Sequence, residues 1–195
     1  MFLLVEVKDS VKIDPKDFGE AMSRSAFKEL AKRYTNKIIP HRGLVITVYD
    51  LLSLSDPLIH PGEPAAAVAL HFRLILFRPL IGQVIQGRIR SVSESGLLIS
   101  LIFFEDITVP EWCLPIGSSF LRDERAWCWE YEGNKLYIDA GEDVRFRVLS
   151  EHWEEPAPLP KDQVLLKELK NEETTPYRII ATIAEDGLGP LSWWT

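Results

Sequence analysis

Two pairs of arginines are the residues of this chain best suited to chemistry. The members of each pair stand on either side of an apolar residue: Arg88 and Arg90 around Ile89, and Arg145 and Arg147 around Phe146. Because successive side chains of a strand point to opposite faces, each pair should share the face opposite its apolar neighbour. Exposed guanidinium groups hold phosphate without reading sequence. The pairs therefore predict either a phosphate-binding surface or a solvated face whose arginines pair with nearby acids.

The other reactive residue types form no catalytic or metal-binding pattern. The two cysteines, Cys113 and Cys128, lack Cys-x-x-Cys spacing, and the four histidines are scattered. We find no carboxylate cluster with metal spacing, no nucleophile-base motif and no glycine-rich phosphate loop. We therefore expect a non-catalytic protein with no metal and no cofactor, in a reducing compartment inside the cell.

Charge is divided unevenly along the 195 residues. Residues 1–90 carry 13 Lys/Arg against nine Asp/Glu, whereas residues 91–195 carry nine against 20, a balance of −11. An acidic half repels phosphate, so tight autonomous binding of nucleic acid is disfavoured. The short apolar start, Met1-Phe-Leu-Leu-Val-Glu, is charged too soon for a signal peptide, and no apolar run is as long as a membrane span. We expect a soluble intracellular protein.

These arginines need a strand scaffold, and residues 79–110 predict one. Gly82, Val84, Gly87, Ile89 and Val92 have the spacing of the first strand of a small curled barrel, in which glycine permits sharp bends. Gly96 adds a second turn before another apolar run. The pattern resembles an S1-type OB barrel, a fold whose strands commonly bind oligonucleotides.

Further strands of this barrel are expected beyond Pro110. Residues 127–131 alternate aromatic and other side chains, a turn at 132–135 follows, and 136–138 returns as the partner of a hairpin. Residues 144–148 alternate as another barrel strand, and 177–184 read as the closing strand. Residues 154–175 are acidic, proline-rich and charged, which predicts an exposed loop or insertion. Trp193 and Trp194 should pack back on the fold, since free indoles are rarely left in water.

Residues 1–78 predict a separate α+β domain with the order β-α-β-β-β. A first strand should run from Phe2 towards Ile13, and Asp14-Pro15 is a plausible helix start. Apolar residues recur every four positions from Phe18 to Tyr34, which predicts a helix with one apolar face. The nearly all-apolar segment 43–54 suggests a central strand, and residues 68–76 alternate as another. A rigid exposed loop, rich in proline and glycine, separates these two strands.

With both halves in view, the chain is similar to the S1-domain stalk proteins of DNA-directed RNA polymerases, a family with archaeal and eukaryotic members, and most of all to its polymerase III branch. The resemblance covers residues 1–153 and the closing strand. It rests on these segments: Met1-Phe-Leu-Leu-Val-Glu, Asn36-Lys-Ile-Ile-Pro, Gly43-Leu-Val-Ile-Thr-Val-Tyr-Asp-Leu-Leu, Phe72-Arg-Leu-Ile-Leu-Phe-Arg-Pro, Phe103-Phe-Glu-Asp-Ile-Thr-Val-Pro, Trp127-Cys-Trp-Glu-Tyr-Glu and Leu136-Tyr-Ile-Asp-Ala-Gly-Glu-Asp-Val-Arg-Phe-Arg-Val.

The resemblance implies a fold, a function and partners. Residues 1–78 would form an α+β domain, a truncated ribonucleoprotein-like sheet with one helix that docks on the polymerase core, and residues 79–195 an all-β S1-type OB-fold domain with acidic insertions. The protein would be a non-catalytic stalk subunit of RNA polymerase III in the nucleus, acting in transcription initiation. It would form a heterodimer with a helical stalk subunit that carries an HRDC-like domain.

The same resemblance suggests a docking loop. The proline-rich loop that includes Pro57, His60, Pro61 and Gly62 would insert into the polymerase core. The alternative is an ordinary surface hairpin, because such loops are common on sheet proteins.

RNA contact is expected to be weak and without sequence preference. Generic S1 domains usually show aromatic residues and a histidine where this chain has Ser95, Leu98 and Val109. The candidates that remain are the four arginines with Phe103 and Phe104, which would meet nascent single-stranded RNA.

The aromatic strand and the overall function each have a competing interpretation. Trp127, Trp129 and Tyr131 could stack bases, but alternating aromatics on a hairpin are more often core or partner interface, which we favour. A free-standing S1-type RNA-binding factor in translation or RNA processing is the alternative to a polymerase subunit. The acidic balance and the missing stacking residues argue against it.

Overall fold

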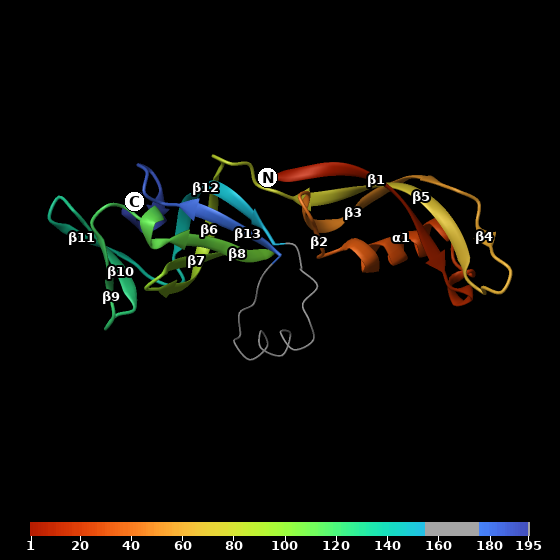
Figure 1. Cartoon of the computed structure of the whole chain (residues 1–195), viewed down its shortest axis with the longest axis horizontal. Coiled ribbons are helices and arrows are strands. Elements are labelled where there is room, and N and C mark those ends of the chain that lie inside the picture. The colour runs from red at the N-terminus through yellow and green to blue at the C-terminus, as the bar shows by residue number, and fades with distance from the viewer. Residues whose placement is uncertain (155–175, 195) are drawn as a thin grey trace. The chain divides into compact units, whose positions relative to one another are not determined.

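The structure is a computed structural model that describes residues 1–154 and 176–194. It divides into two compact units, Met1–Pro79 and Leu80–Thr195, here called the sheet unit and the barrel unit. The expected acidic insertion falls almost entirely on residues 155–175, outside the described residues. Figure 1 labels the helix α1 and the strands β1 to β13.

The sheet unit is an antiparallel sheet with one long helix. Its sheet has the order β1-β5-β3-β2, and the short β4 pairs with the start of β5. The elements are β1 (Phe2–Ile13), the 3-10 helix η1 (Pro15–Asp17), α1 (Met22–Tyr34), β2 (Ile38–Ile39), β3 (Gly43–Leu54), β4 (Leu58–Ile59) and β5 (Ala66–Phe77). The predicted order is confirmed, with β4 as an addition inside the loop that was expected to be irregular.

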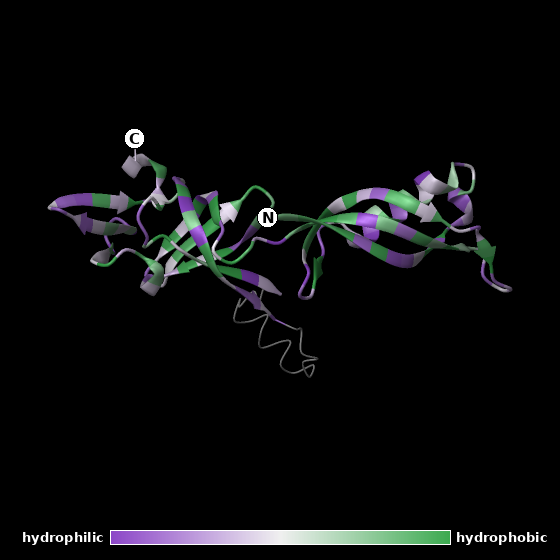
Figure 2. Ribbon diagram, turned by 90° about the horizontal axis from the view of Figure 1, so that it is seen from above, coloured by the Kyte–Doolittle hydropathy of each residue, from purple (hydrophilic) through white to green (hydrophobic). Residues whose placement is uncertain are grey.

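The core of the sheet unit lies between α1 and one face of the sheet. Alternate residues of β5, from Val68 to Leu76, are buried there with Ala26 and Leu30 of the helix. The other face carries polar residues such as His71 and Arg73, and Figure 2 shows the resulting alternation of hydropathy along the strands. The predicted alternation of β5 is therefore confirmed.

One prediction for this unit, the start of the helix, was wrong. The chain forms only a 3-10 turn at Pro15–Asp17, and α1 begins at Met22 after Gly19, so Phe18 lies outside the helix. Glycine has low helix propensity, and the Ser25 hydroxyl donates to the Asp17 carbonyl at 3.0 Å across the break. The apolar run of β3 is an inner strand, as predicted, because it pairs with β5 on one side and with the short β2 on the other; its far end, with Leu52 and Leu54, is exposed.

The barrel unit contains a closed five-stranded barrel with a small added sheet. Strands β6, β7, β8, β13 and β12 pair in sequence, and β12 pairs with both β13 and β6, which closes the ring. Its elements are β6 (Val84–Ser93), β7 (Gly96–Leu101), β8 (Phe104–Pro110), η2 (Glu111–Cys113), β9 (Ser118–Leu121), β10 (Ala126–Tyr131), β11 (Asn134–Ile138), β12 (Asp143–Trp153), β13 (Tyr177–Thr182), β14 (Gly189–Pro190) and η3 (Leu191–Trp194). The predicted α+β domain followed by an OB-type barrel is confirmed.

Glycine is required where the barrel strands come closest. Gly96 has φ +134°, and a Cβ there would lie 2.1 Å from the Val109 carbonyl oxygen. A Cβ on Gly87 would lie 2.8 Å from the Ile99 side chain across the pair of β6 and β7. The first contact explains the glycine at the turn into β7, and the second explains the glycine within the first barrel strand, β6. One detail differs from the expectation, because Ile85 rather than Val84 points into the barrel.

A three-stranded sheet, β11-β10-β9, extends the barrel unit. Glu132 and Gly133 form the turn between β10 and β11 with φ of 47° and 80°, as a two-residue hairpin requires. The C-terminal η3 packs back on the fold, as predicted, because the Trp193 indole lies 5.2 Å from that of Trp129 and donates to the Tyr137 carbonyl at 3.2 Å.

Candidate functional site

The outer face of β6 and β12 gathers three of the four predicted arginines. In the antiparallel pairing Arg145 faces Gln86, and Arg147 faces Val84, so Arg88 is diagonal to Arg145. Diagonal neighbours on one face are within reach of long side chains. Arg90 also points outward, but it follows a break in the register with β7 and is directed at β8.

Each arginine already has an internal partner. Arg88 donates to the Gly141 carbonyl at 2.7 Å, and Arg145 donates to the Gly187 carbonyl at 3.4 Å. Neither bond is to a carboxylate, although Asp143 is the cross-strand partner of Arg88, whereas Arg145 faces the neutral Gln86. Arg147 pairs with Glu185 at 2.9 Å, and Arg90 pairs with Glu105 at 2.5 Å. Exposed ion pairs contribute little stabilising free energy, so a phosphate competes with Glu185 or Glu105 for the arginine and can displace it.

The two phenylalanines at the β7–β8 turn have different surroundings. Phe104 is buried in the barrel, with its ring 5.4 Å from that of Tyr177. Phe103 precedes it in the turn and is 38% exposed. Of this pair, only the Phe103 ring reaches solvent at the barrel surface.

The predicted docking loop is a hairpin with an apolar tip. The loop residues Pro57, His60, Pro61 and Gly62 surround β4, and Gly62 has φ +86°. The sequence prediction missed the most apolar part, because Leu58 and Ile59 of β4 are 66% and 60% exposed while their backbones pair with β5. The available signal in the sequence was two adjacent aliphatic residues inside a loop rich in proline and glycine.

The loop is anchored at its far end by an ion pair. Lys12 Nζ donates to the Glu63 carboxylate at 2.7 Å, and this hydrogen bond holds the pKa of Glu63 below its usual value. The strand β5 begins beside this loop and ends at Phe77, at the opposite end of the sheet unit. At 3.3 Å per residue, the strand is about 36 Å long. The loop therefore forms one extremity of the sheet unit, as Figure 1 shows at β4.

The three predicted interface aromatics on β10 range from buried to exposed. Trp127 is buried and donates to the Ser93 carbonyl at 2.9 Å. Trp129 is half-buried and donates to the Ile116 carbonyl at 3.1 Å, while Tyr131 is 50% exposed. The aromatic side chains of β10 therefore become more exposed along the strand, from Trp127 in the core to Tyr131 at the surface.

Sequence reasoning missed other exposed apolar residues in the barrel unit. Trp112 is 73% exposed, and Ile102 and Ile116 are almost fully exposed. All three stand in connections between strands, where an isolated apolar residue carries no periodic signal that reveals its exposure. They enlarge the apolar surface available to a partner.

The described residues offer no metal centre. Within residues 1–154 and 176–194, no three His, Cys, Asp or Glu side chains are grouped to hold an ion. Cys113 and Cys128 are free and buried, and burial raises the pKa of the Cys113 thiol. In the same residues no helix has the length and apolarity needed to cross a membrane.

Comparison with known families matches both units. The family described as RNA polymerase III subunit Rpc25 matches residues 83–194, more than half of the chain. The SHS2 domain found in the N terminus of Rpb7p/Rpc25p/MJ0397 matches residues 8–64. The first match spans the barrel unit, and the second lies within the sheet unit.

Curated relatives agree over the full length. The chain is 37% identical over 203 residues to the DNA-directed RNA polymerase III subunit RPC8 of Bos taurus, covering 100% of this chain and 99% of the relative. It is 37% identical to rpc8 of Schizosaccharomyces pombe, with 100% of both proteins covered. The chain belongs to the Rpc25 family of RNA polymerase III subunits.

Membership of the Rpc25 family confirms the resemblance seen in the sequence. It also makes the protein an accessory subunit rather than the catalytic one, as predicted. An archaeal relative, the DNA-directed RNA polymerase subunit Rpo7 of Saccharolobus solfataricus, is 24% identical over 201 residues, covering 100% of this chain and 98% of the relative. The similarity extends to archaeal polymerase subunits at lower identity.

Proposed function

We propose that this Rpc25 family member is the barrel-bearing stalk subunit of RNA polymerase III in the nucleus, where it acts in transcription initiation. The sheet unit docks on the polymerase core, a helical subunit with an HRDC-like domain completes a heterodimer, and the barrel unit makes weak contact with nascent RNA. The observation that carries the proposal is the identity with RPC8 proteins along the entire chain.

The docking step is supported by the loop from Pro57 to Pro64. Its tip exposes Leu58 and Ile59, and two aliphatic side chains at the end of a paired hairpin gain free energy when a protein surface covers them. The loop is also well ordered by backbone pairing and by a turn in which Glu63 N–H donates to the His60 carbonyl. A preformed hairpin loses little conformational entropy on docking.

The heterodimer is supported by apolar surface on the barrel unit. Tyr131, Trp112 and Ile116 are exposed, and Trp129 touches this group by its hydrogen bond to the Ile116 carbonyl. Aromatic residues are enriched in protein interfaces, where they bury large areas. Trp127 would support this surface from the core, since its own ring is covered.

Weak RNA contact follows from charge. Arg88 and Arg145, on the outer face of the barrel, bond only to backbone carbonyls, and Arg90 and Arg147 follow them two residues along their strands. Phe103 adds an exposed ring. The −11 balance of residues 91–195 opposes phosphate over the same region. We expect the isolated barrel to bind RNA weakly. Contact with the transcript would therefore depend on the polymerase holding the barrel close to it.

Purification from the native cell tests the proposal. The tagged chain should recover polymerase III subunits and a small helical partner at moderate salt. Replacement of Leu58 and Ile59 by Asp should reduce recovery of the core at least about tenfold, since each charge is desolvated at the contact. Phe18→Asp, at an exposed apolar residue of the same unit, is the matched control and should leave recovery unchanged.

Two outcomes would contradict the proposal. Recovery of the chain alone, or with ribosomal material, would favour a free-standing S1-type RNA-binding factor. Full recovery of the core with both Asp substitutions would remove the loop from the docking surface. Microscopy of the tagged chain should find it in the nucleus.

A further inference from the structure

A hollow of about 340 Å³ lies in the barrel unit between the β10–β11 hairpin and the C-terminal segment. We call it the aromatic hollow. Four rings and two acids line it, with smaller apolar residues between them: Trp129, Tyr131, Trp193, Trp194, Glu185 and Asp186. No lysine or arginine is part of its described lining. It has the size of a small ligand site and joins two segments far apart in the sequence.

The indole N–H groups of this hollow are already satisfied. Trp129 donates to the Ile116 carbonyl at 3.1 Å, Trp193 to the Tyr137 carbonyl at 3.2 Å, and Trp194 to the Leu188 carbonyl at 3.1 Å. A ligand therefore meets the π systems of the rings rather than their donors. The faces of indole rings carry negative electrostatic potential and attract cations.

The rings are held in fixed positions relative to one another. The Trp129 ring centroid lies 5.0 Å from that of Tyr131 and 5.2 Å from that of Trp193. Trp193 packs directly on Gly189, where an added Cβ would lie 2.6 Å from the ring. Because these rings are already ordered, a ligand binds without the entropy cost of immobilising them. Trp194 and Tyr131, each about half exposed, leave the hollow open to solvent.

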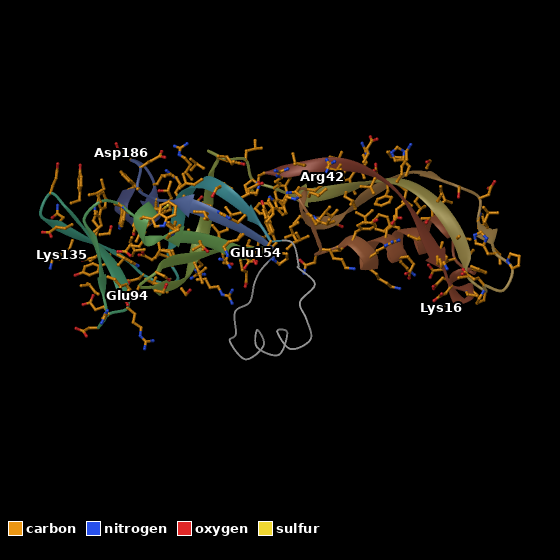
Figure 3. The ribbon with its side chains drawn as sticks, in the orientation of Figure 1. Lys16, Arg42, Glu94, Lys135, Glu154 and Asp186 are labelled. Carbon is orange, nitrogen blue, oxygen red and sulfur yellow. The ribbon has the colours of Figure 1, made fainter. Side chains whose placement is uncertain are left out.

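Of the two acids, Asp186 is the one that leaves a carboxylate available at the edge of the hollow, and Arg145 donates to the adjacent Gly187 carbonyl at 3.4 Å. The Glu185 carboxylate is paired with Arg147 at 2.9 Å. The neighbouring Asp186 is exposed, and its carboxylate has no hydrogen bond or ion pair to other described residues. Figure 3 labels Asp186 on the connection between β13 and β14. Rings and an unpaired carboxylate at one opening both favour a positive ligand.

We propose that the aromatic hollow binds the cationic side chain of an arginine or lysine from a protein partner. RNA fits less well, because its phosphates would approach the Asp186 carboxylate and an acidic half of the chain. An uncharged apolar segment would leave the Asp186 carboxylate desolvated without compensation. A basic peptide satisfies both the ring faces and the carboxylate.

This inference deepens the proposed heterodimer surface, on which it rests, because Trp129 and Tyr131 belong to both. It names a ligand chemistry that the full-length chain should show in isolation, so the peptide titration can fail while recovery of the partner from cells succeeds. The probe is a short peptide of alternating arginine and serine, with a glutamine-and-serine peptide for comparison. Titration into ¹⁵N-labelled protein should shift the indole N–H signals of Trp129, Trp193 and Trp194, but not that of Trp112. The glutamine peptide should produce no comparable shift.

Two substitutions test the contributing groups. Asp186→Asn should weaken binding of the arginine peptide about threefold, and Trp194→Ala should weaken it by about three- to tenfold, the range of an exposed cation–π contact. Both side chains are exposed, so the fold should survive, and dispersed indole signals check this. Asp123→Asn and Ile81→Ala are the controls at exposed sites outside the hollow and should leave binding unchanged.

Three outcomes would overturn the inference. Equal binding of the glutamine peptide would make the hollow an apolar docking site. Shifts of the three indoles by an oligouridylate, stronger than those by the arginine peptide, would make it a base-stacking site. An unchanged affinity in both Asp186→Asn and Trp194→Ala would place the cation elsewhere.

Discussion

The sheet unit and the barrel unit differ in their strand edges: the sheet unit leaves one long edge unpaired, whereas the barrel strands close into a ring. In the sheet unit, the long strand β1 pairs only with β5 among the described residues, so one edge of a twelve-residue strand remains. In the barrel unit, the five barrel strands pair around a closed ring. A closed barrel has no edge to offer, and it presents only side chains to its surroundings.

The difference extends to what the two units expose. The sheet unit leaves aliphatic and aromatic residues of its strands in solvent, among them Phe2, Leu4, Tyr49 and Leu58. The barrel strands β6 and β12 instead present arginines on their outer face. The apolar strand surface of the sheet unit suits permanent docking to protein, whereas the arginine face of β6 and β12 suits a contact that forms and breaks. The apolar surface of the barrel unit, at Trp112, Ile116 and Tyr131, lies outside these two strands. Four predictions test this division.

The largest effect should come from emptying one core. Phe72 is fully buried in the sheet unit, and Phe72→Ala should destabilise that unit by about 3–5 kcal/mol. All six tryptophans lie at positions 112–194, so indole fluorescence reports only on the barrel unit. In urea, the amide signals of β5 should disappear at a lower concentration while the fluorescence midpoint stays. Phe146→Ala, in the barrel, should give the reverse, and a joint shift in both variants would show that the units unfold together.

A smaller effect should follow from a Cβ at the closest approach of barrel strands. At Gly96 the φ is positive and a Cβ would clash with the Val109 carbonyl oxygen. Gly96→Ala should therefore lower the free energy of unfolding by about 2 kcal/mol or more. Gly117→Ala, in the same unit, has a positive φ but open space and should cost only about 1 kcal/mol. Fluorescence-detected urea unfolding measures both. Equal costs would mean that the barrel opens at β7 and β8 without strain.

RNA binding should depend on the barrel face alone. Charge reversal of Arg88 and Arg145 should weaken binding of an oligouridylate about tenfold at low salt and lower the salt slope by about 1.4, the value for two phosphate contacts on a single strand. Filter binding over a salt series measures both quantities. Arg42→Glu, on the sheet unit, is the control (Figure 3). An equal loss in the control would assign the effect to net charge.

Alkaline pH should weaken the sheet unit slightly. Burial, followed by the hydrogen bond to Asp9, raises the pKa of Tyr34 to about 12 from 10.0. Because the folded pKa is higher than the unfolded one, this stabilisation is complete below pH 10 and is lost as the pH rises towards 12. After a discount for solvent screening we expect about 1 kcal/mol. Tyr34→Phe cannot ionise there, so its unfolding free energy should fall less over this range; an identical fall would exclude Tyr34.

Sequence patterns were most informative where a single period governs burial. Alternation predicted β5 and β12, because strand side chains alternate between core and solvent, and glycine spacing predicted the curled first strand of the barrel. Helix and strand ends were less well predicted. The start of α1 at Met22 depended on a 3-10 turn and on Ser25 bonding to Asp17, neither of which has a periodic signal.

Candidate surfaces were predicted as residue types but not as arrangements. The sequence named the arginines, the loop and the aromatic strand, yet it could not say that Arg90 is paired with Glu105 or that Trp127 is covered. It also could not show that Leu58 and Ile59 form an exposed tip. Those facts depend on strand register, which brings residues from distant segments together.

By itself, the sequence determined two domain types, an accessory polymerase subunit and an uneven distribution of charge, because composition, periodicity and family segments are local properties of the chain. Only the tertiary structure decided that the barrel closes through β12 and β13, and that Trp193 returns to Trp129 beside Asp186. The physical reason is that such contacts join residues many positions apart, and no local pattern specifies which long-range pairing the folded chain will form.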